Sequence, residues 1–297
     1  MTRHTHALIV EGGAMRGIFA AGVLDSFLDN QFRPFDVCMG VSAGSTNLAG
    51  FLAGQRGRSH KLITDYSRRK DFINPWKYLR GGHYLDLDWL WEVADKEYPL
   101  NAKACIASGI PLWIVTTNAT TGEANYHLPN EHNLIDLLLA SCALPMVYRT
   151  PPIIDGEIHA DGGVADSVPV LEAYHRGARN MTVILSRPQG YRMPKKRVTA
   201  IVKLLLAHYP QLVEATIKRH INYNKSMDFI DHPPADCTVH VLAPDSAFDV
   251  ARTTTDLNKL EAGYEMGLRT GREFAAGYYV PHNSIENRQR PFDKIKT

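Results

Sequence analysis

The sequence predicts an α/β protein built on a mostly parallel sheet with covering helices. In the first fifty residues, a buried apolar run is followed twice by a glycine-containing turn and then by a segment with helical spacing. This strand–turn–helix order is typical of parallel sheets, in which each helix crosses over to the next strand. The chain has 297 residues, of which 44% are hydrophobic and 22% charged, as in an ordinary globular protein with a substantial core.

The first two strand–helix units are the clearest part of the pattern. Residues 7–10 (ALIV) are a short apolar run that predicts a buried strand, and the glycine-rich turn 11–17 follows it. Apolar residues then recur at helical spacing over residues 18–28. A second buried strand is predicted at 35–41, and the small residues, leucines and phenylalanine of 43–52 predict the next helix.

The later elements are predicted from the same periodicities, with turn residues between them. The pair Asp155-Gly156 is a common hairpin turn. Further helices are predicted at 58–105 (mostly helical), 134–142, after Pro169, at 198–227 and at 255–274. Strands are predicted at 111–118, 181–185 and 238–242. Residues 123–128 are expected to form a hairpin with the strand 111–118, and residues 153–160 to form a short hairpin of their own.

The character of the chain changes after about Arg187. Pro188, Gly190 and Pro194, together with several basic residues, indicate a connecting loop. We therefore divide the chain into a first domain, residues 1–187, and a mostly helical C-terminal extension, residues 188–297. The extension either packs on the same domain or forms a small helical cap, and the sequence leaves both arrangements open.

Charge and cysteine content limit the classes of function. A formal net charge of +2 does not favour a nucleic-acid partner, and the basic runs 68–70 and 195–197 are expected to be solvated faces. The four cysteines contain no C-x-x-C pair and no metal-ligand spacing with histidine, which favours free thiols in a reducing compartment; they are Cys38, Cys105, Cys142 and Cys237. With no leader-like or membrane-spanning run, we expect a cytoplasmic protein that meets lipid from the water side.

The segment Gly40-Val41-Ser42-Ala43-Gly44 matches the pattern G-x-S-x-G between a predicted strand and a predicted helix. A nucleophilic serine on such a sharp turn needs small neighbours, and the following helix directs backbone N–H groups toward it. The simpler interpretation is a serine that caps a helix in a glycine-rich loop. The strand–helix context favours Ser42 as a nucleophile.

The turn that contains Gly12, Gly13 and Gly17 is the second candidate. Its backbone can approach a ligand closely and offer N–H groups to a phosphate or to a developing oxyanion. A dinucleotide fingerprint would need glycine where Ala14 stands and an acidic residue at the end of the next strand, so that interpretation is disfavoured. Arg16 either pairs with a surface carboxylate or has a role near the site.

The segment Asp161-Gly162-Gly163 is on its own an ordinary turn, but a serine nucleophile requires a base. In most serine hydrolases this base is a histidine oriented by an acid. Of the 13 histidines, His127, His159 and His240 stand where turn chemistry follows a predicted strand, and none of them is distinguished further.

Together these segments resemble the patatin-like phospholipase family. The resemblance spans residues 7 to about 187 and rests on four ordered blocks: residues 12–17, 40–44, 140–145 (ASCALP), and 161–163 with Val168-Pro169. It implies a three-layer α/β/α fold and a Ser–Asp dyad without histidine, with Ser42 as nucleophile and Asp161 as base. It also implies oxyanion donors in the glycine-rich loop. The residues carried over are Gly12, Gly13 and Ala14, with Ala43, as oxyanion donors, and Arg16, Gly17, Gly40, Gly44, Gly162 and Gly163 as supporting motif positions.

Ala14 departs from the family pattern, which usually has a third glycine at that position. A methyl group is tolerable there if the backbone has a negative φ, and we expect function to be preserved. The predicted function is a lipid acyl hydrolase or esterase of phospholipase A type that works through an acyl-enzyme on a lipid or small ester. We expect no metal and no cofactor, and transient contact with a membrane surface.

Two other classes of function remain open on the sequence. One is an acyltransferase-like relative; that group resembles G-H-S-x-G with a separate histidine, and Val41 argues against it. The other is a lipid-binding or regulatory protein with a vestigial dyad, which the presence of both Ser42 and Asp161 disfavours.

Overall fold

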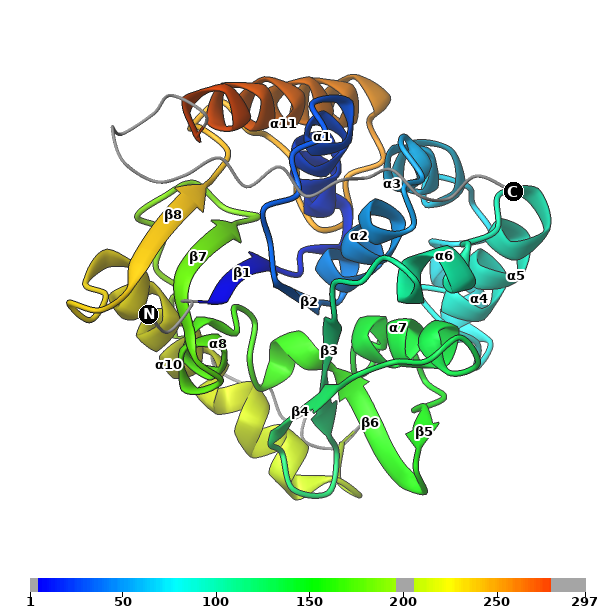
Figure 1. Cartoon of the computed structure of the whole chain (residues 1–297). Coiled ribbons are helices and arrows are strands. Elements are labelled where there is room, and N and C mark those ends of the chain that lie inside the picture. The colour runs from blue at the N-terminus through cyan, green and yellow to red at the C-terminus, as the bar shows by residue number, and fades with distance from the viewer. Residues whose placement is uncertain (1–4, 196–205, 279–297) are drawn as a thin grey trace.

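The computed structural model describes residues 5–195 and 206–278, and within them an eight-stranded sheet lies between helical layers (Figure 1). The order of the strands is β5-β6-β3-β2-β1-β7-β8, and β4 pairs with β3 off this path, at residues Ile114–Thr117. The strands are β1 (Thr5–Val10), β2 (Val37–Val41), β3 (Leu112–Asn118), β4 (Ala124–His127), β5 (Ile153–Ile154), β6 (Glu157–Asp161), β7 (Ala178–Ile184) and β8 (Thr238–Leu242).

The centre of the sheet is parallel, as predicted. β1 pairs in parallel with β2 on one side and with β7 on the other, and β2–β3 and β7–β8 are also parallel. β4 and β6 run antiparallel to β3. Because parallel strands end at the same edge, the turns that follow β1, β2 and β7 lie beside one another.

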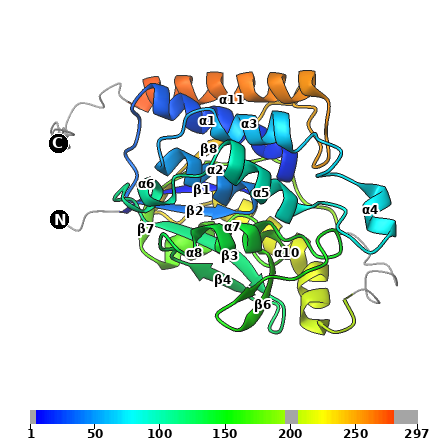
Figure 2. The same cartoon turned by 90° about the vertical axis from the view of Figure 1, so that its right-hand side faces the viewer.

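Helices cover both faces of the sheet, which confirms the three-layer α/β/α fold. Side chains alternate along β1, so that Leu8 and Val10 pack with α1, α2, α7 and α11, whereas Ala7 and Ile9 pack with α8 and α10. Figure 2 shows α1 and α11 above β1 and β2, and α8 and α10 below these two strands. The helices are α1 (Gly17–Asp29), α2 (Ala43–Leu52), α3 (Arg58–Lys61), α4 (Pro75–Leu79), α5 (Leu87–Glu97), α6 (Ala102–Ile106), α7 (Leu134–Cys142), α8 (Val170–His175), α10 (Pro210–Asp231) and α11 (Leu257–Tyr278), with short turns of helix at η1 (Ala14–Arg16), η2 (Leu62–Tyr66) and η3 (Gly162–Val164).

The C-terminal part of the chain adds one strand and two long helices to this architecture. β8 extends the sheet beside β7, and α11 lies directly on α1. Two glycines permit this approach: a Cβ on Gly22 would lie 2.2 Å from the carbonyl oxygen of Tyr264, and a Cβ on Gly267 would lie 2.1 Å from that of Phe19. The described C-terminal segments therefore share the core of the sheet. None of the helices in the described segments has the length and apolarity that crossing a membrane requires.

The helix predicted at 198–227 differs from the structure at its start. Residues 198–205 lie outside the described residues, 206–209 are not helical, and α10 begins only at Pro210. The prediction for 206–209 is wrong because proline disfavours helical backbone in the residue before it, and Tyr209 is accordingly extended at φ −131° and ψ 69°. The hairpin at Asp155-Gly156 is confirmed, with positive φ at both residues.

Candidate active site at the strand ends

Ser42 occupies a sharp turn between β2 and α2. Its backbone is strained, with φ 54° and ψ −129°, a conformation that costs a non-glycine residue about 1–3 kcal/mol. The flanking glycines make the turn sterically feasible. A Cβ on Gly40 would lie 2.5 Å from Cα of Ser45, and one on Gly44 would lie 2.3 Å from the carbonyl oxygen of Val10. The G-x-S-x-G spacing thus reflects two close backbone approaches around a strained serine.

Ser141 holds this turn in place, a role that the sequence analysis did not assign to it. The backbone N–H of Ser42 donates to Oγ of Ser141 at 2.8 Å, and that hydroxyl donates to the carbonyl oxygen of Val115 at 2.6 Å. Ser141 is fully buried near the end of α7, so it links the turn to β3 through two satisfied hydrogen bonds. Its only sequence signal was membership of the 140–145 block.

The glycine-rich loop lies against the Ser42 turn. A Cβ on Gly12 would lie 2.7 Å from the carbonyl oxygen of Val41. Within the described part of the chain, the backbone N–H groups of Gly12, Gly13 and Ala14 donate no hydrogen bond, so they are available to a bound group. The condition of a negative φ at Ala14 is not met, because its φ is 50°. The loop enters η1 through a left-handed residue, a conformation that an alanine adopts at some cost in energy.

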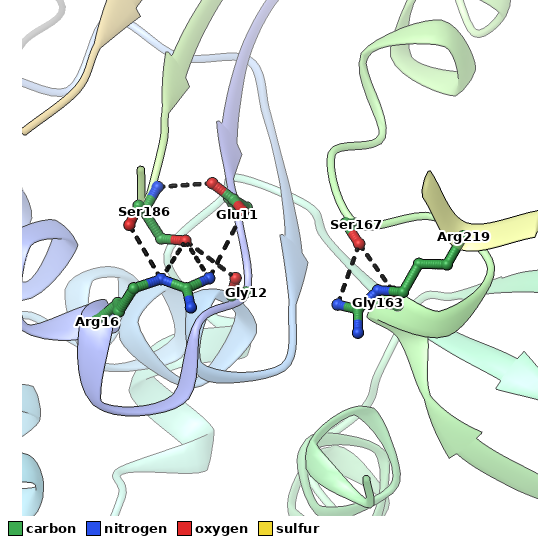
Figure 3. A network of polar contacts seen from close by, with 7 residues as sticks. All are labelled: Glu11, Gly12, Arg16, Gly163, Ser167, Ser186 and Arg219. Carbon is green, nitrogen blue, oxygen red and sulfur yellow. Dashed lines mark hydrogen bonds and ion pairs between the residues drawn. The ribbon is translucent and has the colours of Figure 1, made fainter. Parts of the chain in front are cut away.

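Arg16 is buried, and its guanidinium group links the glycine-rich loop to Ser186 and Glu11 (Figure 3). Its Nε and Nη2 donate to Ser186, which follows β7, at 3.0–3.3 Å, and Nη2 lies 4.0 Å from Oε1 of Glu11. Oε2 of Glu11 accepts a hydrogen bond from the backbone N–H of Ser186 at 2.6 Å. Burial raises the pKa of Glu11 and lowers that of Arg16 to about 10, while their mutual attraction opposes both shifts. Arg16 therefore pairs with a buried carboxylate, rather than with one on the surface.

Asp161 is the last residue of β6, and its backbone is fixed on both sides. Its N–H donates to the carbonyl oxygen of Ala143 at 2.9 Å, and its Oδ1 accepts a hydrogen bond from the N–H of Gly163 at 2.7 Å. A Cβ on Gly162 would lie 2.2 Å from the carbonyl oxygen of Val115, so only glycine allows β6 to turn so close to β3. Burial raises the pKa of Asp161, and the charge of Arg219 and a hydrogen bond with the Ser42 side chain act in the opposite direction.

Two cavities meet at Ser42. The first, which we call the narrow cleft, is lined by Ser42 and Asp161 together with the glycine-rich loop, Leu144, Gly163, Arg219 and Arg252. The second, the apolar cavity, shares Ala14, Ser42, Leu144 and Arg252 with the cleft and holds about 840 Å³ of empty space, part of it open to solvent. Its walls come from α2, η2, α5 and the residues around them, and include Leu62, Ile63, Phe72, Leu87, Leu90 and Trp91. Ala43 lines it beside Ser42.

The histidines considered from the sequence lie elsewhere. Thr116 Oγ1 bonds to His127 Nε2 at 2.8 Å and to His159 Nδ1 at 2.9 Å, and His240 packs against Phe274. No histidine is among the described residues that line either cavity at Ser42. Two residues that do line the cleft, Arg219 and Arg252, could not be identified from the sequence. They are far from Ser42 along the chain, and only the fold brings them near it.

The match to a protein family agrees with this arrangement of elements. The family model described as patatin-like phospholipase matches residues 8–174, more than half of the chain, and so includes the turns at Ser42 and Asp161. The chain belongs to the patatin-like phospholipase family. A second family model, a domain of unknown function (DUF6363), matches residues 209–278, which cover α10, β8 and α11.

Relatives include one uncharacterized protein and several proteins named lysophospholipase. The uncharacterized protein YjjU of Escherichia coli (strain K12) is 34% identical over 274 residues, which cover 91% of this chain and 77% of that protein. The lysophospholipase NTE1 of Saccharomyces cerevisiae is 24% identical over 295 residues, 91% of this chain but only 16% of that much longer protein. The solved structure of VipD from Legionella pneumophila aligns over 92% of this chain and 67% of its own, with 15% identity and a TM-score of 0.48.

Proposed function

We propose that the protein hydrolyses carboxylic esters of lipids, with Ser42 as the nucleophile and Asp161 as its base. The observation that supports this most directly is the meeting of the two residues in one narrow cleft, beside a cavity walled by apolar side chains. Family membership and the lysophospholipase relatives support a lipid hydrolase. The dyad and its acyl-enzyme are our own assignment.

In the first half of the reaction, Asp161 accepts the proton of the Ser42 hydroxyl as Oγ attacks the ester carbonyl carbon. The carbonyl oxygen becomes an oxyanion, which the free N–H groups of Gly12, Gly13 and Ala14, with that of Ala43, are suited to stabilise. When the tetrahedral intermediate collapses, the C–O bond of the ester breaks. The departing alkoxide takes the proton from Asp161 and leaves as the alcohol.

The second half repeats these steps with water. Asp161 accepts a proton as water attacks the acyl carbon, the Ser42–acyl bond breaks, and the proton returns to Oγ as the carboxylic acid leaves. A carboxylate can serve in both halves only if competing water is kept away. Asp161 is 2% exposed, which meets this requirement, and the raised pKa that burial produces also makes it a stronger base.

The apolar cavity supports an acyl chain as the part of the substrate that binds there. Burial of methylene groups contributes about 0.8 kcal/mol each, so a chain of several carbons would add substantial binding energy. Ser42 is among the residues that line this cavity, so an acyl chain bound there would reach the proposed nucleophile. Esters with longer acyl chains should therefore be better substrates than acetates, until the cavity is full.

The test is hydrolysis of p-nitrophenyl esters, from the acetate and butyrate to longer acyl chains, together with labelling by a fluorophosphonate probe. Wild-type protein should hydrolyse the ester and be labelled at one serine, whereas Ser42→Ala should lose both properties. Ser108→Ala is the matched control, because Ser108 lies outside both cavities and its hydroxyl bonds only locally. Equal activity, or equal inactivity, of wild type and Ser42→Ala would remove the catalytic assignment and favour a binding or regulatory protein.

Transfer of the acyl group to an alcohol is the second candidate function. It is favoured by one relative, a mouse protein named 1-acylglycerol-3-phosphate O-acyltransferase Pnpla3, which is 28% identical over 149 residues, 45% of this chain and 32% of that protein. Both reactions share the acyl-enzyme and differ in the group that attacks it. Product analysis with and without added acyl acceptor separates them, since a transferase forms a new ester at the expense of free acid.

We also propose transient contact with a membrane surface through α4. The Trp76 side chain on this short helix is 73% exposed, and the neighbouring Phe72 and Ile73 line the apolar cavity. Aromatic side chains of this kind favour the interface between lipid and water. The fraction of protein that sediments with phosphatidylglycerol vesicles should fall several-fold in Trp76→Ala. An unchanged fraction would exclude this contact.

A further inference from the structure

The C-terminal part of the chain supplies two arginines to the site. Arg219 lies on α10, and Arg252 lies in the segment between β8 and α11. Both line the narrow cleft that contains Ser42 and Asp161, and Arg252 lines the apolar cavity as well. Arg252 is held there by its backbone, whose carbonyl oxygen accepts a hydrogen bond from the N–H of Met15 at 3.4 Å.

The guanidinium of Arg219 has unused hydrogen-bonding capacity. Its one hydrogen bond to a described residue is long, from Nη2 to Oγ of Ser167 at 3.4 Å (Figure 3), and its Nε is buried without a partner. A Cβ on Gly163 would lie 3.3 Å from this Nη2 and 3.0 Å from Oδ1 of Asp161, so the absence of a side chain at Gly163 lets the arginine approach the dyad.

Arg219 is nevertheless not an ion-pair partner of Asp161. No described carboxylate lies within 4.0 Å of a nitrogen of Arg219, and the side chain of Arg252 makes no hydrogen bond or ion pair with any described residue. The carboxylates nearest the loop are already engaged, Glu11 with Arg16 and Ser186, and Asp161 with Gly163. The cleft therefore has more positive than negative charge.

Burial lowers the pKa of Arg219 to about 10, and repulsion from Arg252 adds to this shift. An anion between the two guanidinium groups would relieve that repulsion and satisfy the free Nε. Guanidinium groups suit phosphate in particular, because their planar donors match its oxygens two at a time.

The arrangement of the two cavities indicates which part of the substrate would carry the anionic group. They join at Ser42, so an ester bound with its acyl chain in the apolar cavity directs its alcohol portion into the narrow cleft. On the basis of the proposed hydrolase function, we propose that Arg219 and Arg252 bind a phosphate in that alcohol portion. The preferred substrates are then acyl esters of phosphorylated alcohols whose head group is net anionic, such as a lysophosphatidic acid.

A choline-bearing head group fits this cleft less well. A quaternary ammonium is typically bound by aromatic rings or carboxylates. The described residues that line the cleft include no aromatic side chain, and their single carboxylate, that of Asp161, is assigned to catalysis. Two unpaired guanidinium groups would in addition repel the ammonium.

The experiment compares three soluble substrates with the same octanoyl chain: a lysophosphatidic acid, a lysophosphatidylcholine and a monoacylglycerol. Each variant is assayed on the alkaline plateau of its own pH–rate profile, so that a change in the pKa of Asp161 does not enter the comparison. Arg219→Met and Arg252→Met should each lower kcat/KM for the lysophosphatidic acid by about 10- to 100-fold, the size expected for a lost charge-assisted hydrogen bond, chiefly through a higher KM. Hydrolysis of the monoacylglycerol should change by less than about threefold.

Controls address charge and folding separately. Lys218→Met removes one positive charge from the adjacent position of α10, where the side chain is exposed and paired with Glu214, and should leave all three rates unchanged. Arg219→Lys should recover part of the lost preference. Inorganic phosphate tests the other source of the same chemistry, and weak inhibition by it is expected, because it lacks the acyl chain.

Three outcomes would overturn the proposal. The first is an equal fall in hydrolysis of the lysophosphatidic acid and the monoacylglycerol, which would make the arginines supports of Asp161 or of the fold. The second is a wild-type preference for the choline ester. The third is strong inhibition of every substrate by inorganic phosphate without preference for the anionic lipid, which would indicate a site for free phosphate.

Failure of the hydrolase proposal would look different. In that case wild type and Ser42→Ala would be equally inactive on all three substrates. Binding of the lysophosphatidic acid to Ser42→Ala, measured by calorimetry, would still report on the two arginines, and should weaken about 10- to 100-fold when either is changed to methionine. Equal affinity with and without the arginines would reject the anion site independently of catalysis.

Discussion

The part of the chain up to residue 187 and the described segments after it meet at Ser42, but they contribute different things to the site. The first part supplies two tight backbone turns with free N–H groups, and the side-chain carboxylate of Asp161. The C-terminal segments bring charge, through Arg219 and Arg252, and a helix that packs on α1. In this molecule the geometry for bond cleavage and the proposed recognition of a head group therefore come from different stretches of sequence.

The largest effect on activity is expected from the carboxylate of the first part. Asp161→Asn keeps the shape of the side chain but cannot accept the proton of Ser42, so kcat for a p-nitrophenyl ester should fall about 10²- to 10⁴-fold. Because the pKa of Asp161 is raised by burial, its ionised form opposes folding at neutral pH, and the variant should melt at a higher temperature than wild type. If Asp161→Asn kept its activity and a histidine variant lost it, the Ser–Asp dyad would be wrong and a triad with histidine would take its place.

A substitution at the contact between α1 and α11 tests whether the C-terminal segments are separable from the first part. In Gly267→Val the new Cβ would meet the carbonyl oxygen of Phe19 at 2.1 Å, so the helices must move apart, at a cost of about 1–3 kcal/mol or more in the free energy of unfolding. Gly277→Val on the same helix meets no atom within 4 Å and is the control. A single, earlier unfolding transition in Gly267→Val would support one cooperative unit, whereas two separate transitions would contradict it.

Ser141→Ala affects the turn at Ser42 without touching either arginine. It removes the hydrogen-bond partner of the buried N–H of Ser42 and one of the donors to the carbonyl oxygen of Val115, which should lower the free energy of unfolding by about 1–3 kcal/mol. A fall in kcat without a rise in KM is expected, because the nucleophile is displaced while both cavities remain. Urea denaturation and ester kinetics on the same preparation check both effects, and Ser108→Ala again serves as the control.

The smallest expected effect is on the pH dependence of the rate, through which Arg219 of the C-terminal part acts on Asp161 of the first part. The proposed base is active when ionised, so the rate should decline as the pH falls through the pKa of Asp161, which burial holds above the range of a free aspartate. Arg219 lowers that pKa, so Arg219→Met should move the acid limb of the pH–rate profile for the neutral ester to higher pH. An unmoved limb would show that Arg219 does not act on Asp161.

The first part was largely predictable from sequence because its signals are local. The buried strand at residues 37–41, the small residues after it and the spacing of Gly40, Ser42 and Gly44 all depend on contacts within one turn. The parallel arrangement of the central strands follows from the alternation of strands and helices along this part of the chain. The backbone of Ala14 was not predictable from its residue type, because alanine rarely adopts a positive φ.

The contribution of the C-terminal part was not predictable, because it depends on long-range placement. Arg219 is one of several cations on α10, and nothing in its neighbours distinguishes it from Lys218; only the position of that helix against η3 brings one of them to Asp161. Glu11 and Ser186 form a bond across 175 residues of sequence, which no local pattern signals. The start of α10 at Pro210 was, in contrast, a local signal that the helical periodicity obscured.

The left-handed alanine offers a route to engineering. Ala14 lines both cavities at the point where they join, and its methyl group narrows the space beside the nucleophile. Ala14→Gly would remove a conformational penalty of about 1–2 kcal/mol and the methyl group at the same time. A variant that accepts bulkier esters could therefore be obtained without loss of folding stability, which is uncommon for changes made this close to a reacting atom.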